Sequence, residues 1–104
     1  MIVEQRDYHV FTGKLNEVVR MYATEGIALQ ERHLGNLIGV FTTDIGALST
    51  YTSLWGYASY AEREERRANL QADEAWRDFL ARLQPLLHTQ QNRILIPTAF
   101  SPIR

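Results

Sequence analysis

The chain has 104 residues, enough for one hydrophobic core and too few for two. Apolar residues make up 45% and charged residues 22%, and eleven basic side chains against twelve acidic ones give a net charge of −1. These values exclude a disordered chain and a general nucleic-acid binder, which would carry a basic excess. The absence of cysteine excludes disulfides, thiolate metal sites and thiol nucleophiles. We expect one cytoplasmic domain over residues 1–104, without a signal peptide or the roughly 20-residue apolar run of a membrane span.

The first half of the chain predicts a strand, a helix and a hairpin. β-forming and polar residues alternate over residues 2–10, the spacing of a strand. From Lys14 apolar residues recur at helical spacing, and we expect a helix that ends at Gly35. Gly26 is its weak point, because an interior glycine costs about 1 kcal/mol relative to alanine. The β-rich residues 36–44 and 49–57 then predict an antiparallel hairpin.

The second half predicts two helical segments and a last strand. Ser59 followed by Glu62 is a capping box, in which the hydroxyl accepts from a helical amide and the carboxylate reaches back to the N–H of Ser59. Glu62 is also spaced to pair with Arg66, and the charged residues 62–67 indicate a solvated helix face. Asp73 is a second cap, and Pro85 ends the apolar helix that follows. Residues 90–96 alternate as a strand.

The order β-α-β-β-α-β predicts an α+β, ferredoxin-like fold, a four-stranded antiparallel sheet with both helices on one face. If Leu54 faces the helices, the rings of Tyr51, Trp55 and Tyr57 face away from them. Three such rings exceed the apolar surface that a monomer usually exposes. We therefore expect a homodimer or higher homo-oligomer in which these three residues form the interface and two sheets enclose a barrel-like interior.

Glu4, Arg6 and Tyr8 share one face of the first strand and are the candidate catalytic or binding residues. If they point into the same interior, Glu4 and Arg6 can pair, since buried charges need partners. Arg6 could then clamp an anionic group of a small organic ligand while Tyr8 donates a hydrogen bond. The alternative is an ion pair that only supports the dimer interface.

The sequence assigns no cofactor and no metal. His9, His33 and His88 are too scattered for a metal signature. His33 could instead interact with the negative end of its helix. Haem would need His33 or His88 as an axial ligand. A phosphate-binding loop and the Gly-x-Ser-x-Gly turn of hydrolases are both absent.

Several segments together resemble the NIPSNAP family: Arg32 to Gly35, Ile38 to Gly46, Ser53 to Tyr57, the charged residues 62–67, Glu4 to Tyr8 and Gln90 to Leu95. The resemblance spans nearly the whole chain. It implies a dimeric α/β barrel of the ferredoxin-like class and no established biochemical activity. Related barrels include small monooxygenases and haem-degrading enzymes, whose sites lie between sheet and helices, an analogy of fold only.

Two functions follow as hypotheses. The first is a NIPSNAP-like dimeric barrel that acts as a small binding or interaction module, with no nucleic acid among its partners. The second is a cofactor-free enzyme of the monooxygenase or isomerase kind that acts on a small organic substrate. In the second, Arg6 orients the substrate and Tyr8 or Glu4 moves a proton.

Overall fold

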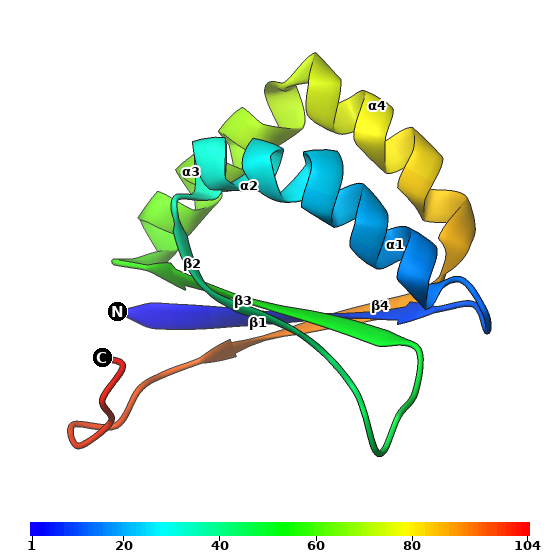
Figure 1. The fold of residues 1–104 in the computed structure, drawn as a ribbon. Coiled ribbons are helices and arrows are strands. Elements are labelled where there is room, and N and C mark those ends of the chain that lie inside the picture. The colour runs from blue at the N-terminus through cyan, green and yellow to red at the C-terminus, as the bar shows by residue number, and fades with distance from the viewer.

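A four-stranded antiparallel sheet carries all the helices on one of its faces (Figure 1). The computed structural model describes residues 1–104. The strands lie side by side in the order β2-β3-β1-β4, and their bounds are β1 Ile2–Val10, β2 Asn36–Thr42, β3 Thr50–Tyr57 and β4 Leu87–Leu95. The predicted ferredoxin-like arrangement is confirmed.

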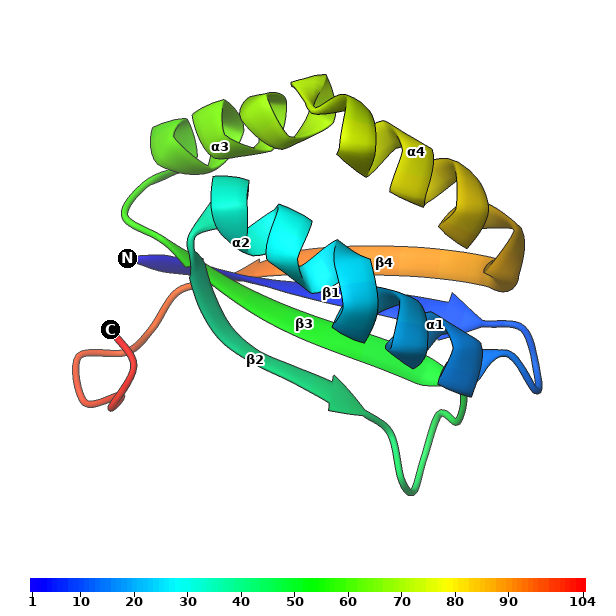
Figure 2. The same ribbon diagram turned by 45° about the horizontal axis from the view of Figure 1, so that its top comes forward.

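The helices form two layers beside each other on the sheet. The first layer consists of α1 (Leu15–Met21), a π-helical turn (Tyr22–Gly26) and α2 (Ile27–Leu34). The second consists of α3 (Tyr60–Ala72), α4 (Glu74–Leu83) and a 3₁₀ turn (Gln84–Leu86). Figure 2 shows α1 and α2 running across β3, with α3 and α4 behind them on the side of β4. None of these helices has the length and apolar character needed to cross a membrane.

The helix ends follow the predicted chemistry. The Ser59 hydroxyl accepts from the N–H of Glu62 at 3.1 Å, and the Glu62 carboxylate accepts from the N–H of Ala58, one residue earlier than predicted. The Asp73 carboxylate accepts from the N–H of Ala75 at 2.9 Å at the start of α4. Gly35 ends α2 with a φ of 87°, a conformation that glycine adopts without strain.

Two strands differ from the prediction at their ends. β2 stops at Thr42, and β4 begins at Leu87, three residues earlier than expected. Val10 pairs with Leu87 across a register shift, so pairing with β1 extends β4 back over Leu87, His88 and Thr89. The Glu62 and Arg66 side chains pair at 2.9 Å as predicted.

Gly26 lies in the π-helical turn rather than at a break. A Cβ atom there would overlap the ring of Phe79 in α4, with Phe79 Cε2 and Tyr22 Cδ1 each 2.8 Å away. Glycine is required because the first helical layer touches α4 at this point.

We predict that Gly26→Ala lowers the free energy of unfolding by about 1–3 kcal/mol, the usual cost of overpacking a core. Helix propensity alone predicts the opposite, a gain of about 1 kcal/mol. Urea unfolding followed by circular dichroism measures the difference. Ala28→Gly, at an exposed position of α2, is the control and should cost about 1 kcal/mol. A more stable Gly26→Ala protein would contradict the close contact.

The core lies between the sheet and the helices, and it contains the three rings predicted to form a dimer interface. Tyr51, Trp55 and Tyr57 are at most 2% exposed within the single chain. Tyr51 stacks on Tyr22 of the first helical layer with ring centroids 4.4 Å apart. The prediction that these rings face away from the helices is therefore wrong. Leu54, assumed to face the helices, points to the other side, because neighbouring strand residues alternate between faces.

The opposite side of the sheet carries no helix (Figure 1). We call it the open sheet face. Cross-strand pairing places on it Val3, Gln5, Asp7, Phe41, Thr52, Leu54, Arg93 and Leu95. Its apolar half, next to the C-terminal segment, contains a shallow groove lined mainly by Val3, Ile38, Leu54, Leu95, Ile96 and Ile103. Its polar half is organised by Asp7, whose carboxylate accepts from the Thr52 hydroxyl at 2.7 Å.

Candidate functional site

Glu4, Arg6 and Tyr8 lie together on the helix-covered side of β1. Pairing with β3 sets Glu4 beside Trp55 and Tyr8 beside Tyr51, in the same alternating set as the core rings. The three residues do share one face, as the sequence indicates. That face lies inside each chain, so the prediction that they enter a space between two sheets is wrong.

The carboxylate of Glu4 is the centre of a buried polar cluster. Its Oε2 atom accepts hydrogen bonds from Arg6 Nη1 at 3.0 Å, Arg63 Nη2 at 2.7 Å and Asn92 Nδ2 at 2.8 Å. The predicted pair of Glu4 and Arg6 is thus present, with two further partners from α3 and β4. The Glu4 side chain itself is fully buried.

Burial on its own would raise the pKa of Glu4. The hydrogen bonds from Arg63 and Asn92 and the positive charges of Arg6 and Arg63 outweigh burial and lower this pKa to about 2. The carboxylate is therefore ionised at neutral pH and engaged by three donors. A group in this state stabilises the cluster and is a poor proton acceptor.

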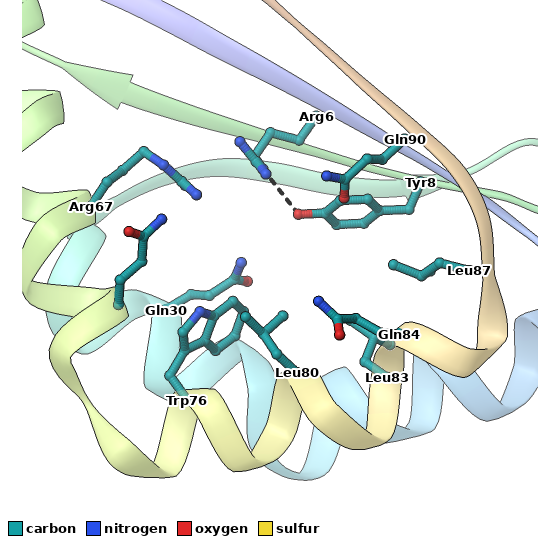
Figure 3. Close-up of a pocket in the computed structure, with 11 residues that line it drawn as sticks. Arg6, Tyr8, Gln30, Arg67, Trp76, Leu80, Leu83, Gln84, Leu87 and Gln90 are labelled. Carbon is teal, nitrogen blue, oxygen red and sulfur yellow. Dashed lines mark hydrogen bonds between the residues drawn. The ribbon is translucent and has the colours of Figure 1, made fainter.

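Arg6 connects this cluster to a cavity between the sheet and the helices. Its Nε atom donates to the Tyr8 hydroxyl at 2.9 Å while its Nη1 atom binds Glu4. Both Arg6 and Tyr8 line the cavity, which has a volume of about 180 Å³ (Figure 3). Glu4 does not line it.

The cavity has a polar side and an apolar side. Its polar side is formed by Arg6 and Tyr8 of β1, by Arg67 of α3 and by the amides of Gln30, Gln71, Gln84 and Gln90. Its apolar side is formed by Trp76, Leu80, Leu83 and Leu87. Gln30 is buried, whereas the other three glutamines are exposed and mark the mouth of the cavity. Figure 3 shows Arg6 and Arg67 directed toward the same space.

Two polar side chains of the lining that are not exposed have no partner within the chain. Gln30 is 1% exposed and its Oε1 atom accepts no hydrogen bond. The Arg67 side chain is half-buried and takes part in none of the side-chain hydrogen bonds or ion pairs of the chain. Burial lowers the pKa of Arg67, and the positive charge of Arg6 lowers it further. Both groups would gain from a bound molecule that supplied the missing contacts.

Sequence reasoning missed Arg63, Arg67 and Gln30 as parts of the site. The charge pattern of residues 62–67 predicts a solvated face, which is wrong for Arg63 and Arg67. These two arginines are one helical turn apart on the side of α3 that also carries the fully buried Leu70. That spacing was the available signal, because residues three and four apart share a helix face.

The histidines lie outside the cavity. His33 Nε2 is 2.8 Å from Asp73 Oδ2 and so links α2 to the start of α4. His9 Nδ1 is 3.1 Å from the Thr50 hydroxyl, and His88 packs edge-on against Phe11. No three His, Asp or Glu side chains come together in a group that could hold a metal ion.

The fold and the sequence have known relatives. The family model described as NIPSNAP matches residues 3–102. The chain belongs to the NIPSNAP family. "Protein NipSnap homolog 1" of Danio rerio is 32% identical over 104 residues, which are 99% of this chain and 36% of that protein. The chain therefore spans about a third of the length of that curated relative.

Solved structures of NIPSNAP proteins have the same fold. A NIPSNAP family protein from Agrobacterium tumefaciens superposes with a TM-score of 0.97 at 50% identity, over 99% of this chain and 98% of that one. An antibiotic biosynthesis monooxygenase superposes with a TM-score of 0.63 at 9% identity, over 94% of this chain and 99% of that one. The second likeness extends to the fold alone.

Proposed function

We propose that this NIPSNAP domain is a binding module that takes a small organic molecule into the cavity between sheet and helices. The observation that carries this proposal is the lining itself. An apolar wall from α4 and β4 faces a small set of fixed polar groups from β1, α2 and α3. Small-molecule sites combine these two features, apolar area for affinity and a few placed polar groups for orientation.

The composition of the cavity favours binding over catalysis. Glu4 is outside the lining and is held by Arg6, Arg63 and Asn92. The lining contains no carboxylate, histidine or serine that could act as a base or a nucleophile. The cavity lining offers donors and acceptors of hydrogen bonds together with apolar surface.

Ligand-observed NMR with a library of single-ring fragments tests this proposal. We expect hits on the wild-type protein that disappear in Leu80→Trp, because the larger side chain would fill the cavity from α4. Leu48→Trp, in an exposed loop, makes a comparable change in size and should keep the hits. A library without hits, or hits that survive Leu80→Trp, would contradict the proposal.

The second candidate function is an enzyme that moves a proton of a small substrate, and Tyr8 is the observation in its favour. Its hydroxyl lines the cavity and accepts from Arg6, so it can offer its own proton to a bound molecule. Glu4, the other candidate for this role, is unsuitable because its carboxylate lies outside the cavity lining and three donors on one of its oxygens hold its pKa low. Proton exchange of a bound fragment, measured in D₂O and lost in Tyr8→Phe, would support the enzyme; unchanged exchange would favour the binding module.

We further propose that the domain forms a homodimer through the open sheet face. This face exposes Phe41 and Leu95, and beside it the C-terminal segment exposes Ile96 and Ile103. Exposed apolar patches of this kind mark interfaces. The face also carries Asp7 and Arg93, which form no ion pair within the chain. A twofold copy of the same surface can cover the apolar patch and set each Asp7 near an Arg93 of the other copy.

The prediction for this interface is that Leu54→Asp separates the protomers while the fold is kept. Leu54 is half-buried at the centre of the face. In the dimer the substitution would bury two carboxylates, one from each protomer, in an apolar contact, and we expect it to lower the dimer affinity at least about a hundredfold. Light scattering after size exclusion measures the mass, and circular dichroism checks the fold. Leu48→Asp, at an exposed position of the loop between β2 and β3, is the control. A wild-type monomer, or a dimeric Leu54→Asp protein, would contradict the interface.

A further inference from the structure

The charges around the cavity do not balance within the chain. Three guanidinium groups, those of Arg6, Arg63 and Arg67, lie near one carboxylate, that of Glu4. Arg6 and Arg63 both bind the same Glu4 oxygen, at 3.0 Å and 2.7 Å. The cluster therefore keeps an excess of positive charge, and the lining of the cavity contains no acidic residue that could offset it.

The guanidinium of Arg67 presents this excess positive charge to the cavity. Arg67 belongs to the lining and is half-buried, and its guanidinium has neither an ion pair nor a hydrogen bond in the chain. Arg6, which also lines the cavity, already has its Nε atom on Tyr8 and its Nη1 atom on Glu4. Arg67 is thus the arginine of the cavity whose guanidinium is wholly available to an incoming group. Guanidinium groups bind carboxylates through two parallel hydrogen bonds.

The rest of the cavity limits the body of the ligand. Its volume is about 180 Å³, and a cavity of roughly 150 Å³ is enough to hold benzene. Trp76, Leu80, Leu83 and Leu87 supply apolar surface for one ring or a compact branched chain. The buried Gln30 Oε1 atom, without a donor of its own, calls for a hydroxyl or N–H on that body.

We propose that the cavity selects a small organic anion, a carboxylate on a compact apolar body with one hydrogen-bond donor, with Arg67 as the receptor of the carboxylate and Gln30 as the acceptor of the donor. This inference rests on the proposed binding function and names the class of its ligand. An inorganic oxyanion would use Arg67 but leave the apolar wall in contact with water. A neutral ring would use the wall and leave Arg67 without a partner.

Isothermal titration calorimetry with benzoate, benzamide and inorganic phosphate tests whether the cavity prefers an organic carboxylate. Benzoate and benzamide have nearly the same shape and differ in charge. We expect the wild-type protein to bind benzoate at least about tenfold more tightly than benzamide or phosphate. Arg67→Gln should weaken benzoate binding at least about tenfold and so remove that preference. This variant should fold as well as the wild type, because it removes a charge that repels Arg6.

Arg20→Gln is the matched control, since Arg20 is exposed on α1 and has no ion pair. It makes the same change of charge away from the cavity and should keep the preference for benzoate. Equal binding of benzoate and benzamide, tighter binding of phosphate, binding of none of the three, or an Arg67→Gln protein that still prefers benzoate would each overturn the inference. The fragment screen with Leu80→Trp decides the proposed binding function separately, because its hits can be neutral.

The three hydroxybenzoate isomers test the role of Gln30. We expect at least one isomer to bind about tenfold more tightly than benzoate, because its hydroxyl donates to the Gln30 oxygen. Gln30→Met, which keeps the length of the side chain, should remove this gain and leave benzoate binding unchanged. Three isomers that bind no better than benzoate, or a gain that survives Gln30→Met, would show that Gln30 is not the acceptor.

Discussion

Trp55→Ala is expected to lower the free energy of unfolding by about 3–5 kcal/mol, the range for removing a large buried ring. Trp55 is fully buried in β3 beneath the helices of its own chain, and its indole N–H donates to the Ser53 hydroxyl at 3.2 Å. The substitution leaves a large void and removes a donor from a buried hydroxyl. Urea unfolding followed by far-ultraviolet circular dichroism measures the loss.

Leu54→Ala, the neighbouring position on the open sheet face, is the comparison for Trp55→Ala. Leu54 is half-buried in the single chain, so its truncation should cost the fold about 1 kcal/mol, less than for a fully buried leucine. Its main effect should be on the mass of the assembly. If Trp55→Ala instead left the fold stable and separated the protomers, the ring would belong to an interface and the core placement would be wrong.

Glu4→Gln is expected to destabilise the fold by about 3 kcal/mol at pH 7, since removing one charge of a buried ion pair leaves the others uncompensated. The glutamine keeps the shape and can still accept from Asn92. It no longer offsets the charges of Arg6 and Arg63, which contact Glu4 directly. Urea unfolding of both proteins at the same ionic strength measures the difference.

The same pair of proteins gives a pH dependence with a defined sign. Because the pKa of Glu4 is about 2 in the folded chain and 4.5 in the reference state, the unfolded chain binds the proton first as pH falls. The stability due to the Glu4 charge is complete above about pH 4.5 and is lost between pH 4.5 and 2, a change of about 3 kcal/mol. The gap between wild type and Glu4→Gln should therefore close over this window.

Other carboxylates do not disturb this comparison. The hydrogen bonds to Glu62 and Asp73 lower the pKa of each, so both contribute to acid unfolding, but they are present in both proteins. Their effects cancel in the difference. A gap that stays constant from pH 7 to pH 2 would contradict the role of the ionised Glu4.

The order of the elements could be predicted because local chemistry specifies it. Ser59 and Asp73 each accept a hydrogen bond from a helical N–H, and Gly35 adopts the positive φ that ends α2. These signals need no information from distant parts of the chain. The start of β4 could not be found in the same way, because pairing with β1 determines it.

The face of the sheet that packs against the helices could not be predicted from the alternation of residues along the strands. The period of two separates Trp55 from Leu54 but does not say which of them meets the helices. Both sets carry apolar residues, and the set with the large rings also carries Glu4 and Arg6. The packing of the helices determines which set is covered. Tyr22 packs edge-on against Phe79 of α4, and Tyr51 of β3 stacks on Tyr22.

Only part of the candidate site could be predicted from the sequence. Glu4, Arg6 and Tyr8 are adjacent on one strand, so their common face follows from sequence. Arg63 comes from α3, 59 residues from Glu4 along the chain, and the hydrogen bond between them depends on the packing of α3 over the sheet. A buried carboxylate needs such partners, and Arg63, on the same side of α3 as the buried Leu70, supplies one.

A ¹H–¹⁵N NMR titration with benzoate that observes side-chain as well as backbone signals tests whether the ligand site lies inside the domain. The cavity lies between sheet and helices, so the indole N–H of Trp76, the amide of Gln30 and the Nε–H of Arg67 should shift together. Signals of Leu54 and Leu95 on the open sheet face should stay in place. Shifts confined to that open face, or none at saturating benzoate, would contradict a ligand site inside the domain.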